Sequence, residues 1–239
     1  MQPRLLVLAL SLVILVGCDH IGSIGSHSVV GTGPDKTDSR SMGAFTKVQL
    51  RNAIEGTIIV DGKSSVEIQA KESLLPLVKT HVEGGELIVE TTQSIDSSTP
   101  VKVVIHVAGL DELRTTGASS ADVSGLKSES FTLTGSGASR ISLSGDAKKL
   151  TAEASGASEI NLKGAFPDAS LKAGGASNIH SEDAQIGSVK ADATGASTIR
   201  LGSIKSLAAV AAGASTIKYQ GKPNVSSSES SGASTISGS

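Results

Sequence analysis

The tripeptide Gly-Ala-Ser recurs through the second half of this chain at a nearly constant spacing. Its seven copies, 18–20 residues apart, run from Gly117 to Ser119, Gly137 to Ser139, Gly156 to Ser158, Gly175 to Ser177, Gly195 to Ser197, Gly213 to Ser215 and Gly232 to Ser234. This period is too short for a helical-hairpin repeat or a propeller blade, and the consensus of leucine-rich repeats is absent. The spacing therefore predicts an all-β fold, a β-solenoid of about seven coils of 18–20 residues that pair along parallel strands.

The residues after each copy alternate as they do in a strand with one buried face. Two positions beyond the serine stands isoleucine in six copies and Ala121 in the first, and the residue between them is polar or charged in every copy. The serines therefore share the inward face. Two interpretations are open: the hydroxyls bond to one another or to corner carbonyls inside the coil, or the corners splay outward and offer a row of hydroxyls to a ligand.

Small residues mark the approach to each glycine. Two positions before it, the inward column holds alanine in four copies and Thr115, Gly135 or Ser230 in the others. Converging backbones at a sharp corner leave no space for larger side chains. Each Gly-Ala-Ser copy is therefore predicted to be a corner, and the motif is given a structural role.

The N-terminus has the pattern of a secretion signal that ends at a lipid-attachment cysteine. Arg4 precedes a 12-residue run over 5–16, apolar except for one serine and too short to span a bilayer comfortably. Cys18 follows Leu-Val-Gly, which resembles the bacterial lipobox, and as the only cysteine it cannot form an internal disulfide. We predict a signal peptide over residues 1–17, acylation of Cys18 with palmitate-type chains, and a flexible tether over 18–41.

Residues 42–110 lack the motif but are predicted to be rich in strands. The expected strands cover 45–50, 56–60, 66–69, 86–90 and 101–107, with a short helix or turn at 71–79 and a hairpin turn at 84–85. This section is predicted to be irregular and to cap the first coil of a repeat solenoid over 111–239. The serine-rich final coil, 225–239, is either a frayed end or a docking edge, and fraying is favoured.

The order of these segments resembles one family. The chain has Phe-x-x-Val-x-Leu at 45–50, Leu-Leu-Pro-Leu-Val at 74–78, Gly-Gly-Glu-Leu-Ile-Val at 84–89 and Val-Val-Ile-His-Val at 103–107, followed by the repeated corners. This order resembles the family called "putative auto-transporter adhesin, head GIN domain" over residues 42–239. The resemblance implies a right-handed parallel β-helix in a bacterial envelope protein, and it brings no functional residues with it.

The charge of the chain and the distribution of its reactive residues argue against several classes of function. With 21 basic and 23 acidic residues the chain lacks the basic excess of a nucleic-acid binder. The acidic residues and histidines form no repeated column, so no catalytic residue, metal ligand or cofactor site is assigned.

The leading hypothesis is a non-enzymatic, adhesin-like or scaffold lipoprotein in the bacterial cell envelope. Its lipid would hold it to a membrane facing the periplasm or the exterior, and it would bind a protein or glycan ligand. One alternative is a carbohydrate-active β-helix enzyme, which only the fold favours. Another is a partner in envelope sensing or signalling. Binding of ice or crystal surfaces is disfavoured, because the threonine column at Thr198, Thr216 and Thr235 is too short.

Overall fold

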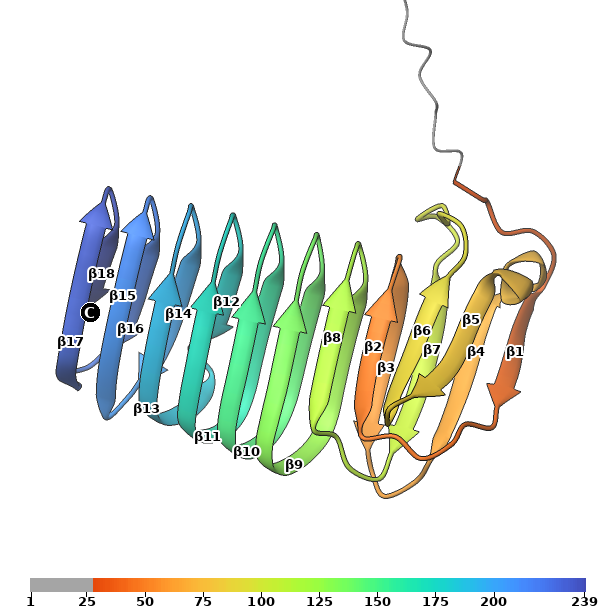
Figure 1. Cartoon of the computed structure of the whole chain (residues 1–239), viewed down its shortest axis with the longest axis horizontal. Coiled ribbons are helices and arrows are strands. Elements are labelled where there is room, and N and C mark those ends of the chain that lie inside the picture. Colours follow the sequence, from red (N-terminus) through yellow and green to blue (C-terminus); the bar gives the residue numbers. More distant parts are fainter. Residues whose placement is uncertain (1–27) are drawn as a thin grey trace, which may run out of the picture.

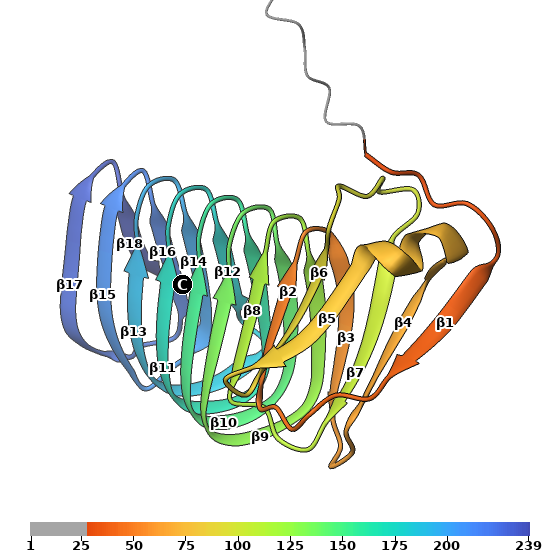
Figure 2. The same cartoon turned by 45° about the vertical axis from the view of Figure 1, so that its right-hand side comes forward.

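The computed structural model describes residues 28–239, so the predicted signal peptide and Cys18 lie outside the described residues. The described chain winds into a solenoid with a front and a back sheet, which meet at sharp corners along one edge and at wider bends along the other (Figures 1 and 2). The predicted β-solenoid is confirmed. Its elements are β1 (Asp35–Arg40), β2 (Lys47–Arg51), β3 (Ile54–Val60), β4 (Ser65–Lys71), the 3-10 helix η1 (Glu72–Leu77), β5 (Val78–Glu83), β6 (Glu86–Thr91), β7 (Val101–Val107), β8 (Glu112–Thr116), β9 (Ser120–Gly135), β10 (Arg140–Ala154), β11 (Glu159–Ala173), β12 (Asn178–Ser181), β13 (Ala184–Ala193), β14 (Thr198–Ser203), β15 (Ser206–Gly213), β16 (Thr216–Gln220), β17 (Asn224–Gly232) and β18 (Thr235–Gly238).

The coils stack in the register that the repeat predicts. In the back sheet Ile141, Ile160, Ile179, Ile199 and Ile217 pair in turn across parallel strands, and all five are fully buried. Strands β9, β10 and β11 each bend and continue into the front sheet, whereas later coils use a separate strand for each sheet. Because equivalent residues lie above one another, one inward isoleucine per coil builds a continuous core.

The section predicted to be irregular contains two further coils. β2 pairs in parallel with β6 and β8, and β3 pairs in parallel with β7 and β9. The β2–β3 coil therefore lies between two coils that come later in the chain. Its corner is made by Asn52 and Ala53, both in the left-handed region with φ of 63° and 64°, and the β6–β7 corner is the loop 92–100. Neither corner contains the motif, so the repeat did not reveal these coils.

Antiparallel strands and a short helix close the N-terminal end. β4 pairs with β7, β1 pairs with β4, and β5 pairs with β6 through the hairpin turn predicted at 84–85. η1 occupies the helix or turn predicted at 71–79 and buries Leu74 completely. The Arg40 guanidinium donates to the carbonyl of Val78 at 3.0 Å and so joins β1 to β5. The reversed strands end the parallel ladder at this side, where β1, rich in charged residues, forms the edge of the back sheet.

The predicted tether over 18–41 is wrong for residues 28–41. Val29 forms a bridge with Ile95, and its amide donates to the carbonyl of Ser94 at 2.7 Å. β1 follows, and the ion pair between Lys71 and Asp35 at 3.1 Å adds to its ladder with β4. The sequence of β1, Asp-Lys-Thr-Asp-Ser-Arg, has no apolar residue. A strand held at an edge by its main chain needs none, and hydropathy patterning cannot identify it.

The core is narrow at the corners and wider at the bends. Near the corners the inward positions of the front sheet hold small residues such as Ala154 and Ala173, exposed by 1% and 2%. Further along the strands Phe131 and Phe166 are buried among leucines and isoleucines. No helix in residues 28–239 has the length and apolar character needed to cross a membrane.

The final coil is ordered, so the predicted fraying is wrong. β17 pairs along its length with β15, and β18 pairs with β16. Its inward positions differ from those of the coil below, because Ser228 and Ser230 stand where Ala209 and Ala211 lie. Its role as a docking edge stays a prediction.

Candidate functional site

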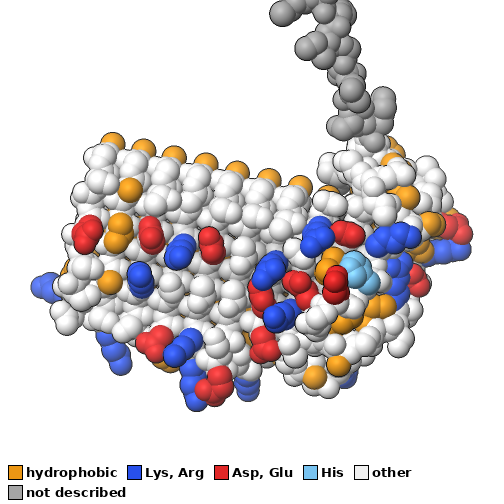
Figure 3. All heavy atoms as spheres, viewed as in Figure 1, with side chains coloured by type: hydrophobic (Ala, Val, Ile, Leu, Met, Phe, Trp, Pro, Cys, Tyr) orange, Lys and Arg blue, Asp and Glu red, His pale blue; other side chains and the backbone are white. Residues whose placement is uncertain are grey.

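The Gly-Ala-Ser corners form a continuous line along one edge of the solenoid, here called the corner ridge. Every corner glycine has φ between 73° and 81°. From the second corner on, an added Cβ would lie 2.7–2.8 Å from the carbonyl oxygen of the preceding corner glycine, so no larger residue fits. The alanine amides donate to those same carbonyls at 2.7–2.8 Å. The alanine methyl groups face solvent as a row of apolar side chains (Figure 3).

The motif serines point inward and use their hydroxyls within the corner. In five coils the Oγ donates at 2.9–3.1 Å to the carbonyl two positions before the glycine of the preceding coil, namely from Ser158, Ser177, Ser197, Ser215 and Ser234. Ser119 donates instead within its own corner, to the carbonyl of Thr116. The Oγ of Ser139 is buried without a hydrogen-bond partner in the described chain. Apart from that of Ser139, the motif hydroxyls donate to corner carbonyls, as in the first of the two interpretations, and do not form a row that is offered to a ligand.

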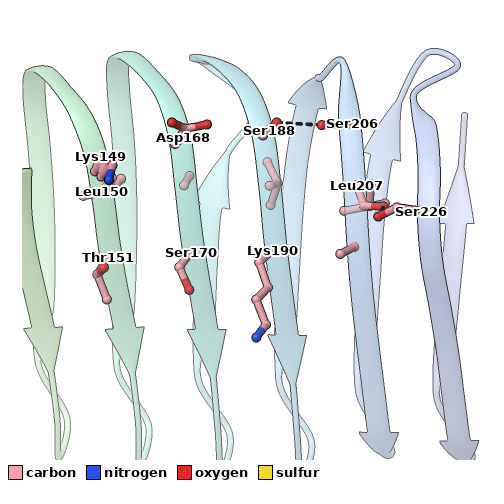
Figure 4. A pocket seen from close by; sticks show the side chains of 13 residues that line it. Lys149, Leu150, Thr151, Asp168, Ser170, Ser188, Lys190, Ser206, Leu207 and Ser226 are labelled. Atoms are coloured by element: carbon pink, nitrogen blue, oxygen red, sulfur yellow. Dashed lines mark hydrogen bonds between the residues drawn. The ribbon is translucent and has the colours of Figure 1, made fainter.

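A shallow hollow of about 400 Å³, here called the trough, crosses β10, β11, β13, β15 and β17 in the front sheet (Figure 4). Its polar side chains are Lys149, Thr151, Asp168, Ser170, Ser188, Lys190, Ser206 and Ser226. The hydroxyls of Ser188 and Ser206 bond to each other at 2.7 Å. The surface is hollowed because serine, threonine and alanine occupy most of its outward positions.

The charged groups of the trough are available to a ligand. Lys149, Asp168 and Lys190 are exposed, and no ion pair within residues 28–239 involves them. Together with the hydroxyls they provide donors and acceptors across five successive strands. The trough runs along the solenoid axis and can therefore contact an extended polar chain at several points.

The wide bends carry charged residues along the edge opposite the corner ridge, here called the charged edge. Its residues are Lys127, Glu129, Asp146, Lys148, Lys163, Glu182, Asp183 and Lys205. Two hollows of about 530 and 650 Å³ adjoin there and share Ala165 and Pro167. Ion pairs form between Lys148 and Glu129 and between Lys163 and Asp183. The equal numbers of lysines and acids do not favour a polyanion or a polycation as partner.

A notch of about 420 Å³ interrupts the corner ridge at the β2–β3 corner. The loop beginning at Thr92 forms one side and the corner at Ala118 the other. Asn52 donates from its amide to the carbonyl of Thr91, and the Thr91 hydroxyl donates back to the carbonyl of Asn52, at 3.1 and 2.9 Å. These bonds hold the left-handed corner, so its polar groups serve the fold.

Besides Asp96, whose pKa is lowered by hydrogen bonds from the hydroxyl and amide of Ser98 in the loop 92–100, two acidic side chains of the back sheet and its end have lowered pKa values for local reasons. Desolvation raises the pKa of Asp61, but hydrogen bonds from His106, at 2.9 Å, and from the Lys63 amide outweigh it and hold the pKa low. The pKa of Glu159 is lowered chiefly by a hydrogen bond from Asn161 and, to a smaller extent, by one from Arg140. Both groups lie near the surface, in the back sheet and at its end. Nowhere in residues 28–239 do three histidine, cysteine, aspartate or glutamate side chains gather as a metal site would require.

Sequence reasoning located the corners but not the trough. The predicted corner residues, from Gly117 to Ser234, lie along the corner ridge and its inner side, while Cys18 lies outside the described residues. The trough was missed because it consists of outward positions whose identity changes from coil to coil. Mapping outward positions onto the stacked coils would have placed Lys149 beside Asp168, since they are register partners.

Comparison with solved structures gives the same architecture. A putative adhesin from Bacteroides fragilis is 22% identical, with a TM-score of 0.79 over 89% of this chain and 100% of that one. A putative lipid binding protein from Parabacteroides distasonis is 20% identical, with a TM-score of 0.72 over 89% and 100%. A putative adhesin from Parabacteroides merdae is 17% identical, with a TM-score of 0.69 over 89% and 99%. At these identities the likeness shows the fold alone.

The family relationship rests on a separate match. No curated protein matches the sequence. The family model described as "putative auto-transporter adhesin, head GIN domain" matches residues 44–223, which include both motif-free coils and the first six corners. The chain therefore belongs to the putative auto-transporter adhesin, head GIN domain family.

Proposed function

We propose that the protein is a non-enzymatic, adhesin-like binding module held to a membrane of the bacterial cell envelope by a lipid on Cys18. The observation that carries the binding role is the trough, where Lys149, Asp168 and Lys190 stand free among hydroxyls over five strands. Membership of an adhesin-like family supports a place at the cell surface or in the envelope. The structures of similar fold are described as putative adhesins and a putative lipid binding protein, and these descriptions do not share one ligand class.

The way in which the fold uses its polar groups supports a binding role over catalysis. Six of the seven repeated serines are buried, and all but Ser139 donate to carbonyls, which removes the most numerous candidate nucleophiles from solvent. The His106–Asp61 pair lies at the far end of the back sheet from the trough, among exposed residues. The polar groups of the trough are thus arranged to contact a bound partner and not to carry out a reaction.

The lipid anchor is supported by the lipobox and by the position of the first described residues. Ser28 and Val29 already contact the loop 92–100. Only the short segment after Cys18 then separates the acylated residue from the folded body. Two or three acyl chains on Cys18 would anchor the protein stably.

The anchor is tested by intact mass and membrane fractionation of the native protein beside a Cys18→Ser variant. We expect a membrane-bound, acylated species that begins at Cys18, and a variant that leaves the membrane. A soluble and unacylated native protein would refute the anchor.

The binding role is tested with purified envelope fractions, including isolated cell wall and outer-membrane vesicles. The Lys149→Ala/Lys190→Ala variant should bind less than the wild type, whereas the control Lys127→Ala/Lys148→Ala, on the charged edge, should bind as the wild type does. Equal binding by all three proteins would show that the trough is not the contact surface.

A further inference from the structure

The side from which the chain leaves the solenoid has a consequence for how the body sits in the envelope. We infer that the solenoid is held with its corner ridge toward the membrane surface and its charged edge away from it, an inference that rests on the proposed lipid on Cys18. The trough, on one side of the body, and the charged edge would then both be open to partners.

The first described residues show on which side of the solenoid the tether begins. Val29 donates from its amide to Ser94 at 2.7 Å and accepts from the amide of Asp96 at 2.9 Å. The Ser28 hydroxyl also reaches Asp96. The loop that holds these residues rises at the same edge as the corners, and both views place the first described residues there (Figures 1 and 2). The tether therefore begins on the corner-ridge side of the body.

The length of the tether distinguishes between two orientations, one with the corner ridge toward the bilayer and one with the charged edge toward it. Ten residues lead from Cys18 to Ser28. A flexible chain of that length spans about 17 Å on average and about 35 Å when fully extended. One limb of a coil, such as the ten residues of β13, is about 30 Å long. With the charged edge on the bilayer, the tether would have to run nearly straight along the whole height of the body. With the corner ridge toward the bilayer, its average length is sufficient.

The distribution of charge agrees with this orientation. The four-residue corners, from 116–119 to 231–234, contain only glycine, alanine, serine and threonine. On the face shown in Figure 3, charged side chains lie below the corners and along the opposite edge. The charged edge has four lysines and four carboxylates, so an anionic bilayer exerts little net force on it, and the uncharged corners meet such a surface without repulsion. In this orientation the corner ridge faces the lipid surface without inserting into it and without binding a ligand of its own.

The test measures energy transfer from one labelled position to acceptor lipids. Because Cys18 is the only cysteine and carries the lipid, a second cysteine can be labelled selectively. Ala176→Cys places the label on the corner ridge and Asp183→Cys places it on the charged edge of the same coil; both native residues are exposed. The acylated proteins are inserted into phosphatidylethanolamine–phosphatidylglycerol vesicles that contain a headgroup-labelled acceptor, after circular dichroism has shown that both are folded.

We expect several-fold greater transfer from the label at position 176 than from the label at 183. Equal or reversed transfer in acylated protein would overturn the orientation and leave the anchor intact. Absence of acyl chains by intact mass would instead overturn the proposed anchor.

A second variant tests the cause. Twenty glycine and serine residues inserted after His20 lengthen the tether to an average of about 30 Å, and the difference between the two labels should then shrink. A difference that the insertion leaves unchanged would show that the tether length does not set the orientation.

Discussion

Alanine in place of Gly175 should strongly destabilise the solenoid. Gly175 has φ of 73°, and an alanine held there costs about 1–2 kcal/mol in conformation. Its Cβ would also lie 2.7 Å from the carbonyl oxygen and 3.2 Å from the amide nitrogen of Gly156. That oxygen accepts the amide hydrogen of Ala176 at 2.7 Å, so it cannot move without loss of the ladder. Adding the cost of overpacking, about 1–3 kcal/mol, we expect a loss of about 2–5 kcal/mol in the free energy of unfolding.

The adjacent glycine provides a matched control. Gly174 does not have a left-handed backbone, and an added Cβ would meet only the hydroxyl of Thr194 at 3.4 Å, an ordinary contact. Gly174→Ala should therefore be neutral, or should stabilise by about 0.4–1 kcal/mol because alanine restricts the unfolded chain. Both variants add one methyl group to the same corner, and they differ only in local geometry.

Urea denaturation followed by circular dichroism gives the free energy of unfolding of each protein. Because coils of a solenoid contact only their neighbours, hydrogen exchange should also show the loss of protection in Gly175→Ala concentrated in the coils beside the substitution. Equal stabilities for the two variants, or a larger loss for Gly174→Ala, would refute the argument that left-handed backbone and close stacking require glycine at the corner.

Three further predictions concern single side chains. The single proton of the Ser177 hydroxyl is shared between the carbonyls of Ala154 and Gly174, and the Ala154 carbonyl also accepts from the amide of Gly174. Ser177→Ala should therefore cost about 0.5–1.5 kcal/mol by urea denaturation, whereas Ser139→Ala, whose hydroxyl has no partner in the described chain, should be nearly neutral; equal losses would contradict this. The pKa of Glu159 is lowered chiefly by the hydrogen bond from Asn161, so its stabilisation is present above the usual pKa of glutamate and is lost as the pH falls through the lowered value. Glu159→Gln should therefore be less stable than the wild type at neutral pH and match it in acid, and a difference that persists in acid would argue against the charge. Ser228→Val makes an inward position of the last coil apolar and should produce larger, concentration-dependent species in sedimentation velocity; a variant that sediments as the wild type does would show that the serine does not limit association.

The periodic part of the fold followed from the sequence because its corners and its core use the same residues in every coil. The isoleucine column of the back sheet and the corner glycines are in the predicted register. The β2–β3 coil could not be ordered in this way, since Asn52 and Ala53 replace the motif and its partners lie on both sides in the later chain. β1 escaped detection because main-chain pairing and ion pairs hold it, without an apolar residue.

The difference between inward and outward positions explains why the trough was not predicted. Inward positions are restricted by packing, so they repeat, whereas the outward positions Lys149, Asp168, Ser188 and Ser206, which occupy one column, are not constrained by their neighbours. Periodicity therefore contains information about the core and little about the surface that a partner meets. The coils have to be stacked first, and the outward positions then mapped onto them, before the sequence shows which side chains share a surface.

This asymmetry also bears on function within the family. Structures that are 17–22% identical to this chain have the same fold, as expected if the corners need glycine and the core needs only small or aliphatic residues. The motif consequently cannot distinguish one ligand from another, because its glycines serve the backbone and its serines serve buried carbonyls. On the proposed binding role, we expect specificity to reside in outward columns such as the one that holds Lys149 and Asp168. Exchange of these outward residues between two relatives, with the corners and the core unchanged, should therefore transfer binding preference while leaving stability nearly the same.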